Sequence, residues 1–145
     1  MKTEHSAGGI IVRNIRGIWE VLVIRDSQNV LTFPKGLIQK DEDPADTALR
    51  EIGEEVGLTQ ISVIKKLPVI RYIYKKKEFI SKTVQYYFCE ATGDEKLKPQ
   101  HDEGIHNAEW LPIDTAIENI GYPKTNKKLL VLTKQFIWKS HPRLM

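Results

Sequence analysis

Residues Gly36–Leu58 read GLIQKDEDPADTALREIGEEVGL, and this acidic segment is the starting point for interpreting the rest of the chain. It holds seven acids and two bases, a net charge of −5, although the 22 bases and 19 acids of the whole chain give +3. The remainder therefore holds 20 bases and 12 acids, or +8. Concentrated like charge is unfavourable unless a cation lies nearby or the segment is a solvated helix face. Charge alone leaves both interpretations open.

A helix is predicted from Pro44 to Val56 within this segment. Asp43 is a suitable N-cap, proline is favoured at the first helical position, and Gly57 is a suitable C-terminal stop. Apolar residues recur at helical spacing and form one face. They are Ala45, Leu49, Ile52 and Val56.

Three glutamates share another face of the predicted helix. Glu51, Glu54 and Glu55 stand at i, i+3 and i+4, and this face is expected to point away from the apolar one. Hard divalent cations take oxygen ligands, and magnesium usually takes one or two protein carboxylates together with phosphate oxygens of a substrate. The spacing therefore favours a divalent cation over a merely solvated face.

The same segment resembles the Nudix box, Gly-x5-Glu-x7-Arg-Glu-apolar-x-Glu-Glu-x-Gly-apolar, and every specified position matches over residues 36–58. The resemblance implies a fold of the α/β (α+β) class, in which a mixed β-sheet is sandwiched between α-helices. It also implies hydrolysis of a nucleoside diphosphate linked to another group, with magnesium or manganese as the cofactor.

The resemblance also assigns roles to single residues. Arg50 matches the residue that orients the helix glutamates. Glu103, in Gln100-His101-Asp102-Glu103-Gly104, occupies the region from which many members supply a base, and Glu51 is the alternative base. The implied metal ligands are the carbonyl of Lys35 and the carboxylates of Glu51, Glu54, Glu55 and Glu103.

Within the family, the chain most resembles the asymmetric diadenosine tetraphosphate hydrolases of the MutT-like branch. In that group a tyrosine stacks on adenine and lysines contact phosphate. Tyr74 and Tyr87 match the first role, and Lys35 and Lys82 suit the second. The supporting stretches are Ala7–Val12, Phe33–Gly36 and Lys82–Phe88, whereas Leu37 and Gln39 depart from the His and Glu of many relatives.

The rest of the chain intermixes strands and helices, which indicates an α/β or α+β class. The predicted strands are 7–13, 19–24, 30–33, 61–74 with a break near Pro68, 81–89 and 108–111, and the further helices are 112–117 and 124–138. Residues 34–36 are predicted as a loop. With 145 residues, one domain over 1–145 is expected.

Location and partners follow from simple features. The lone Cys89 allows no internal disulfide, and the N-terminus lacks a signal peptide, so a reducing cytoplasm is expected. No apolar run reaches the ~18–20 residues that span a bilayer. Lys75–Lys77 could attract a nucleic acid, but no stacking platform or helix-turn-helix signature supports one. A small nucleotide bound by a monomer is therefore expected.

Several substrates remain open, because specificity lies outside the box. Diadenosine polyphosphates, nucleoside triphosphates, RNA 5′ ends, ADP-ribose and inositol pyrophosphate all contain a phosphoanhydride bond. A catalytically silent nucleotide-binding module is the alternative from another class, since fold does not imply function. The presence of all the box carboxylates favours the hydrolase.

Overall fold

A computed structural model describes residues 1–141, and eight strands and three α-helices lie within this range. The strands are β1 (Lys2–Ile15), β2 (Ile18–Arg25), β3 (Leu31–Thr32), β4 (Lys35–Leu37), β5 (Ile61–Lys66), β6 (Ile70–Lys75), β7 (Phe79–Ala91) and β8 (Asn107–Pro112). The helices are α1 (Pro44–Val56), α2 (Ile113–Asn119) and α3 (Pro123–Ser140), with one 3-10 turn, η1 (His101–Glu103). None of the helices in this range combines the length and the hydropathy needed to cross a bilayer.

All eight strands belong to one mixed sheet. Its main path is β3-β2-β1-β7-β5, and β4 pairs with β1, β6 with β7, and β8 with β2. The central strands β1 and β7 are parallel, from Lys2 opposite Ile80 to Val12 opposite Glu90, whereas the other pairs are antiparallel. This long pairing explains why β1 starts before the apolar run that predicts it, because the polar residues 2–6 are held by partner strands.

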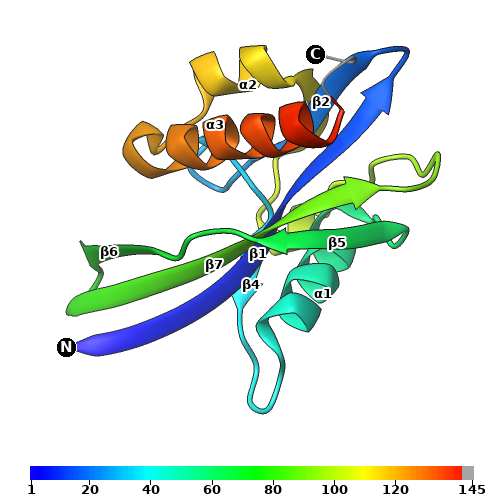
Figure 1. The fold of residues 1–145 in the computed structure, drawn as a ribbon. Helices are drawn as coiled ribbons and strands as arrows, with labels where there is room; N and C mark the ends of the chain where they lie inside the picture. The colour runs from blue at the N-terminus through cyan, green and yellow to red at the C-terminus, as the bar shows by residue number, and fades with distance from the viewer. Residues whose placement is uncertain (142–145) are drawn as a thin grey trace.

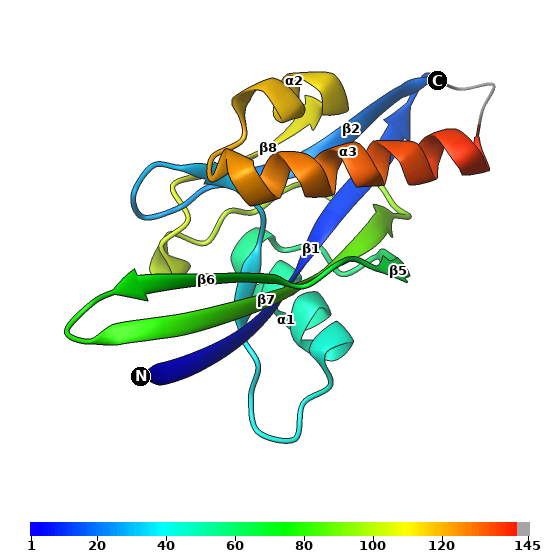
Figure 2. The ribbon, with the colours of Figure 1, turned by 60° about the vertical axis from the view of Figure 1, so that its left-hand side comes forward.

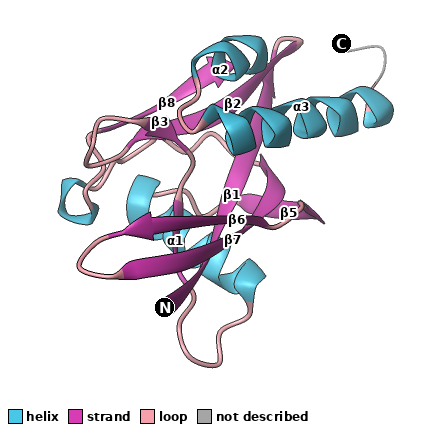
Figure 3. Ribbon diagram, turned by 90° about the vertical axis from the view of Figure 1, so that its left-hand side faces the viewer, coloured by secondary structure: helices cyan, strands magenta, loops and turns pink. Residues whose placement is uncertain are grey.

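Helices cover both faces of the sheet. Figure 1 shows α1 on one side and α2 with α3 on the other, and Figure 3 shows the same layers from another direction. Each side has its own core, in which Ile52 and Val56 of α1 pack on one face and Leu130 and Ile137 of α3 on the other. The predicted mixed sheet between helices is therefore confirmed.

Helix α1 has the predicted limits and caps. The Ala45 N–H donates to Asp43 Oδ1 at 2.9 Å, and Gly57 ends the helix with φ of 79°. The prediction that all three glutamates face away from the apolar side is wrong for Glu55, which is only 6% exposed. The reason is that the buried face is centred on Ala48, Ile52 and Val56, and Glu55 adjoins it.

The segment predicted as a loop before α1 contains the short strand β4. It pairs antiparallel with β1, with Gly36 opposite Ala7, and the Gly9 N–H donates to the Pro34 carbonyl at 3.1 Å. A Cβ on Gly8 would lie 2.2 Å from the Pro34 oxygen, so glycine is required for this approach. The pairing holds Lys35 beside α1, which positions the site described next.

Candidate active site

Arg50 is the centre of an ionic network beside the sheet. Its Nε and Nη2 donate to the two carboxylate oxygens of Glu42 at 2.8 and 3.0 Å. Its Nη1 donates to Glu51 at 2.9 Å and to Glu54 at 3.1 Å, and Nη2 also donates to the Leu37 carbonyl at 3.1 Å. The planar, forked guanidinium suits such multiple contacts and orients three carboxylates at once.

Glu42 holds Arg50 from the loop before the helix. Hydrogen bonds from the Arg50 guanidinium, and then from the Thr47 hydroxyl at 2.6 Å, lower the pKa of Glu42 to about 2. The Gln39 N–H donates a further hydrogen bond at 3.1 Å. Glu42 is therefore charged at any ordinary pH and serves as the fixed partner of Arg50.

Glu55 is in the opposite electrostatic situation. Burial, followed by the charge of Glu51, raises the pKa of Glu55 to about 8, although the Lys35 ammonium and backbone favour the charged form. Its Oε2 is buried and lacks a hydrogen-bond partner among the described residues. A buried carboxylate oxygen without a partner is costly, and a cation placed against it would remove that cost.

Glu51 is packed against the first glycine of the box. A Cβ on Gly36 would lie 2.0 Å from the Glu51 carboxyl carbon, so glycine leaves the room that this carboxylate occupies. Burial raises the pKa of Glu51, and the charge of Arg50 opposes the shift. The glycine thus has a direct role in placing Glu51 beside Glu55.

The 3-10 turn η1 brings Glu103 to the same region. The Gln100 N–H donates to the Glu55 carbonyl at 2.9 Å, and the Lys98 N–H donates to the Val56 carbonyl at 2.8 Å. The negative charge of Glu103 contributes to the raised pKa values of Glu51 and Glu55. Its own side chain is exposed, in keeping with a group that reaches a bound substrate.

A divalent cation fits this donor set. Over residues 1–141, no three His, Cys, Asp or Glu side chains lie close enough together to hold a metal ion by themselves, and Arg50 bridges Glu51 and Glu54 instead. Magnesium, however, needs only one or two protein carboxylates and keeps several waters. The unpartnered Glu55 oxygen is the position where such an ion would be stabilised.

Comparison with known proteins identifies the family. The family model described as "NUDIX domain" matches residues 3–136. The chain belongs to the Nudix hydrolase family. The Nudix box of this chain is the loop, helix and glycine stop that carry Arg50 and the three glutamates.

Individual Nudix relatives differ in the functions that their names give. A Caenorhabditis elegans Ap4A hydrolase, in a binary complex, superposes with a TM-score of 0.83 at 25% identity, covering 94% of this chain and 98% of that one. A Mycobacterium tuberculosis relative named putative mutator protein MutT4 is 31% identical over 84% of this chain and 52% of its own length. A Brucella abortus RNA pyrophosphohydrolase is 28% identical over 72% of each chain. This chain thus spans about half of the MutT4 relative.

A cavity of about 850 Å³ opens beside the Nudix box, between β6 and the start of α3. Figure 2 shows α3 lying over β6 and β7. The cavity is lined by aromatic, basic and polar side chains. They are Gln28, Thr32, Lys35, Ile70, Arg71, Tyr72, Tyr74, Lys82, Tyr86, Tyr122, Pro123, Lys124, Thr125 and Asn126.

Lys35 connects the cavity with the Nudix carboxylates. Its side chain lines the cavity, and its charge acts on Glu55. Burial, and then the charge of Lys82, lowers the pKa of the Lys35 amine, while Glu55 raises it. A polyanion in the cavity would therefore meet two lysines whose mutual repulsion it relieves.

Tyr74 is held at the cavity wall by Glu4. The Tyr74 hydroxyl donates to Glu4 Oε1 at 2.6 Å, which raises the pKa of Tyr74 to about 12. Glu4 also lies 3.5 Å from Lys82 Nζ. The Tyr72 ring is 6.1 Å from the Tyr74 ring, so two aromatic faces lie together.

The structure brings together Tyr74, Lys35 and Lys82 but does not bring Tyr87 into the cavity. Because neighbouring strand residues face opposite sides, Tyr86 lines the cavity whereas Tyr87 packs in the core beneath α1. Sequence reasoning missed Tyr122 as a lining residue. No local signal identifies it, because it reaches the cavity only through the placement of α3.

Proposed function

We propose that the chain is a divalent-metal-dependent pyrophosphohydrolase that cleaves diadenosine tetraphosphate to ATP and AMP. The observation that carries the proposal is the position of Lys35, which lines the cavity and whose charge and backbone favour the charged form of the buried Glu55 carboxylate. A phosphate chain bound along Lys35 would pass directly in front of the box carboxylates. The substrate and the catalytic groups would then meet at one lysine.

The metal would be held by Glu55, by the Lys35 carbonyl and by Glu51, Glu54 or Glu103. When bound, magnesium or manganese supplies charge neutralisation at the phosphate oxygens and activation of water. Arg50 keeps two of these carboxylates oriented, as its hydrogen bonds to Glu51 and Glu54 indicate. In this arrangement the α1 carboxylates would bind the metal, Arg50 would fix their orientation, and the neighbouring cavity would bind the substrate.

Protein groups carry the remaining steps of the reaction. Glu103 accepts the proton of the attacking water, with Glu51 as the alternative base. The water oxygen bonds to the phosphorus next to one adenosine, and the bond from that phosphorus to the bridging oxygen breaks. ATP leaves and AMP keeps the new oxygen, so the products balance the substrate and one water.

The cavity supports a dinucleoside substrate in size and in chemistry. Its volume falls within the ~300–1,000 Å³ of small-molecule sites. Tyr72 and Tyr74 on β6 and Tyr122 before α3 offer aromatic faces to an adenine, while Lys35 and Lys82 offer charge to phosphates. The similarity to an Ap4A hydrolase over 94% of this chain further supports this substrate.

The test is hydrolysis of diadenosine tetraphosphate with magnesium in water enriched in heavy oxygen, followed by mass analysis. ATP and labelled AMP are expected. Two ADP molecules would contradict the asymmetric cleavage. Brisk hydrolysis of a nucleoside triphosphate, ADP-ribose or inositol pyrophosphate instead would reassign the substrate, and no hydrolysis of any of them would favour a non-catalytic binding module.

RNA 5′ ends are the second candidate substrate, and two observations favour them. The Brucella abortus RNA pyrophosphohydrolase is 28% identical over 72% of each chain. In addition, Arg71 and Lys124 stand at the cavity together with exposed Tyr72 and Tyr122. Release of pyrophosphate from triphosphorylated RNA, measured beside the dinucleoside assay, would rank the two substrates.

A further inference from the structure

The two chain segments that flank the cavity contain bases but no acids. Residues 61–77 hold six bases and residues 123–140 hold five, without one Asp or Glu. The other residues hold 11 bases and 19 acids, a net charge of −8. Among the described residues, only Lys134 of these eleven bases has a carboxylate within ion-pair distance, that of Asp114 at 2.6 Å. Positive charge is therefore concentrated on the two segments that flank the cavity, and most of these bases have no ion-pair partner among the described residues.

One row of α3 side chains leads away from the cavity. Lys124 lines the cavity, and Lys128, Leu132 and Phe136 follow at intervals of four residues, which share one inclined row on a helix. At the end of the row, the Nζ of Lys65 on β5 lies 4.2 Å from the centre of the Phe136 ring. The row thus connects the cavity to a lysine on the opposite segment.

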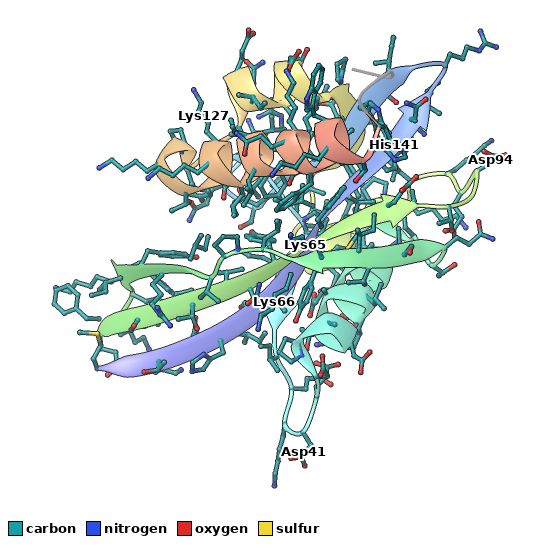
Figure 4. The ribbon with its side chains drawn as sticks, viewed as in Figure 1. Asp41, Lys65, Lys66, Asp94, Lys127 and His141 are labelled. Atoms are coloured by element: carbon teal, nitrogen blue, oxygen red, sulfur yellow. The ribbon has the colours of Figure 1, made fainter. Side chains whose placement is uncertain are left out.

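Lys66 has the same charge as Lys65 but belongs to the other face of the sheet. In the β5–β7 ladder, Lys65 is opposite Phe88, which is part of the core beneath α3. Lys66 is opposite Tyr87, which is part of the core beneath α1. The two lysines, labelled in Figure 4, therefore form a matched pair in which only Lys65 faces α3.

Lys127 is the equivalent control on α3. It lies seven residues, about two helical turns, before Lys134, whose amine pairs with Asp114 of α2. Lys127 therefore faces the α2 side of the helix rather than the row of Lys124 and Lys128. Figure 4 shows Lys127 on the side of α3 that is turned away from the strands.

Exposed aromatic rings stand where the row starts. Tyr72 is 40% exposed and Tyr122 is 51% exposed, and both line the cavity. Proteins that bind single-stranded nucleic acids combine a basic groove along the backbone with aromatic faces on which bases stack. An acidic peptide would pair with the basic side chains, but it has no bases to stack on these aromatic rings.

We propose that Arg71, Lys124, Lys128 and Lys65 form a basic track that binds the phosphodiester backbone of single-stranded RNA. The 5′ end of the RNA lies in the cavity, its first bases stack on Tyr72 and Tyr122, and the following phosphates run along α3 towards Lys65. The track rests on the second candidate substrate proposed above. It makes RNA binding depend on length, which a site for a dinucleotide alone would not do.

The experiment measures binding of 5′-hydroxyl RNA to the whole chain in a chelator, so that no hydrolysis interferes. Single strands of two nucleotides and of about twelve nucleotides are compared over a salt series. The longer strand is expected to bind at least ~10-fold more tightly, with a steeper salt dependence. Equal affinity for the two lengths would overturn the proposal.

Four variants with the same change in net charge locate the binding. Lys128→Gln and Lys65→Gln are each expected to weaken binding of the longer RNA and to reduce the slope of log K against log salt by about 0.7. Lys127→Gln and Lys66→Gln should change neither. If all four variants weaken RNA binding equally, the RNA is attracted only by the net charge of the protein, and the proposed track is wrong. Equal binding of a DNA strand with the same sequence would overturn its assignment to RNA.

Activity assays separate this inference from the proposed function. Lys128→Gln and Lys65→Gln should leave the hydrolysis of diadenosine tetraphosphate unchanged, because neither residue lines the cavity. Length-dependent RNA binding with no hydrolysis of any substrate would support the track and contradict the proposed function. Hydrolysis of triphosphorylated RNA at a rate independent of its length, with no length-dependent binding, would contradict the track alone.

Discussion

The carboxylate face of α1 and the cavity beneath α3 are built in different ways. Arg50, Glu51, Glu54 and Glu55 fall within six consecutive residues, and the helix itself sets their spacing. The cavity instead collects side chains from β3, β4, β6, β7 and the start of α3. The spacing of the carboxylates is therefore encoded locally, whereas the lining of the cavity depends on how distant segments are placed.

The two regions also carry opposite electrostatic imbalances. Burial raises the pKa of Glu55 on the α1 side, and burial lowers the pKa of the Lys35 amine on the cavity side. A cation with a bound polyphosphate would relieve both shifts at once.

The largest effect is expected from Glu55→Gln. A metal ion supplies several kcal/mol of charge stabilisation to the transition state, so losing its main ligand should reduce kcat by at least ~10³-fold. The measurement is turnover of diadenosine tetraphosphate at saturating magnesium, with substrate binding measured separately. Binding through the cavity should remain, and near-normal turnover by the folded variant would reject the metal site.

Glu103→Gln tests whether the 3-10 turn supplies the base. A loss of about 10²-fold in kcat with little change in KM is expected, since a general base contributes ~10²–10⁴-fold. If Glu51→Gln alone gives this pattern, the base lies in α1 and the turn has another role. Asp102→Asn, in the same exposed turn, is the matched control and should retain activity.

Without metal, the Glu55→Gln protein should be more stable than the wild type at pH 8. The pKa of Glu55 is raised from its ordinary value of 4.5 to about 8, so its contribution to stability is full below pH 4.5 and is lost as pH rises to 8. The difference, on the order of 4 kcal/mol at pH 8, should vanish below pH 4.5. Denaturant unfolding in a chelator measures it, and magnesium should stabilise only the wild type.

The difference between local signals and the placement of distant segments also explains which features the sequence could predict. The limits and caps of α1 follow from Asp43, Pro44 and Gly57, because caps act locally. Burial of Glu55 did not follow, since it depends on how α1 is rotated against β1. Strand β4 was missed for a similar reason: its three residues carry no periodicity, and pairing with β1 alone makes them a strand.

The cavity residues also differ in whether the sequence predicts them. Tyr74 was identified from a resemblance, and alternation along β6 adds Tyr72 to the same face. Tyr87 was grouped with them although its neighbour Tyr86 occupies the cavity side, because the sequence did not reveal which face of β7 points there. Tyr122 could not be predicted, since the positive φ of 52° at this residue and the docking of α3 place it.

Tyr74→Ala tests the cavity side of the comparison. Loss of a stacking contact worth ~1–3 kcal/mol should raise KM for diadenosine tetraphosphate roughly 5- to 150-fold, with a smaller change in kcat. Tyr74→Phe keeps the ring and loses only the hydrogen bond to Glu4, so it should stay close to wild type. Tyr87→Phe, on the α1 side, should leave KM unchanged. A lower melting temperature with unchanged kinetics in Tyr74→Ala would make Tyr74 a structural residue.

The smallest effect is expected from Glu42→Gln, which changes a second carboxylate of the α1 region. The Arg50 guanidinium lowers the pKa of Glu42 from 4.5 to about 2, the reverse of the shift at Glu55. A lowered pKa gives stability that is present above pH 4.5 and is lost as pH falls to 2, because the unfolded chain takes up the proton first. The melting temperature of Glu42→Gln should therefore lie a few degrees below that of the wild type at pH 7, and the two should converge near pH 2. The metal-free Glu55→Gln protein should show the opposite course between pH 4.5 and 8. If both variants instead follow the wild type in parallel at every pH, Arg50 does not hold Glu42 in its charged form and burial does not hold the proton on Glu55.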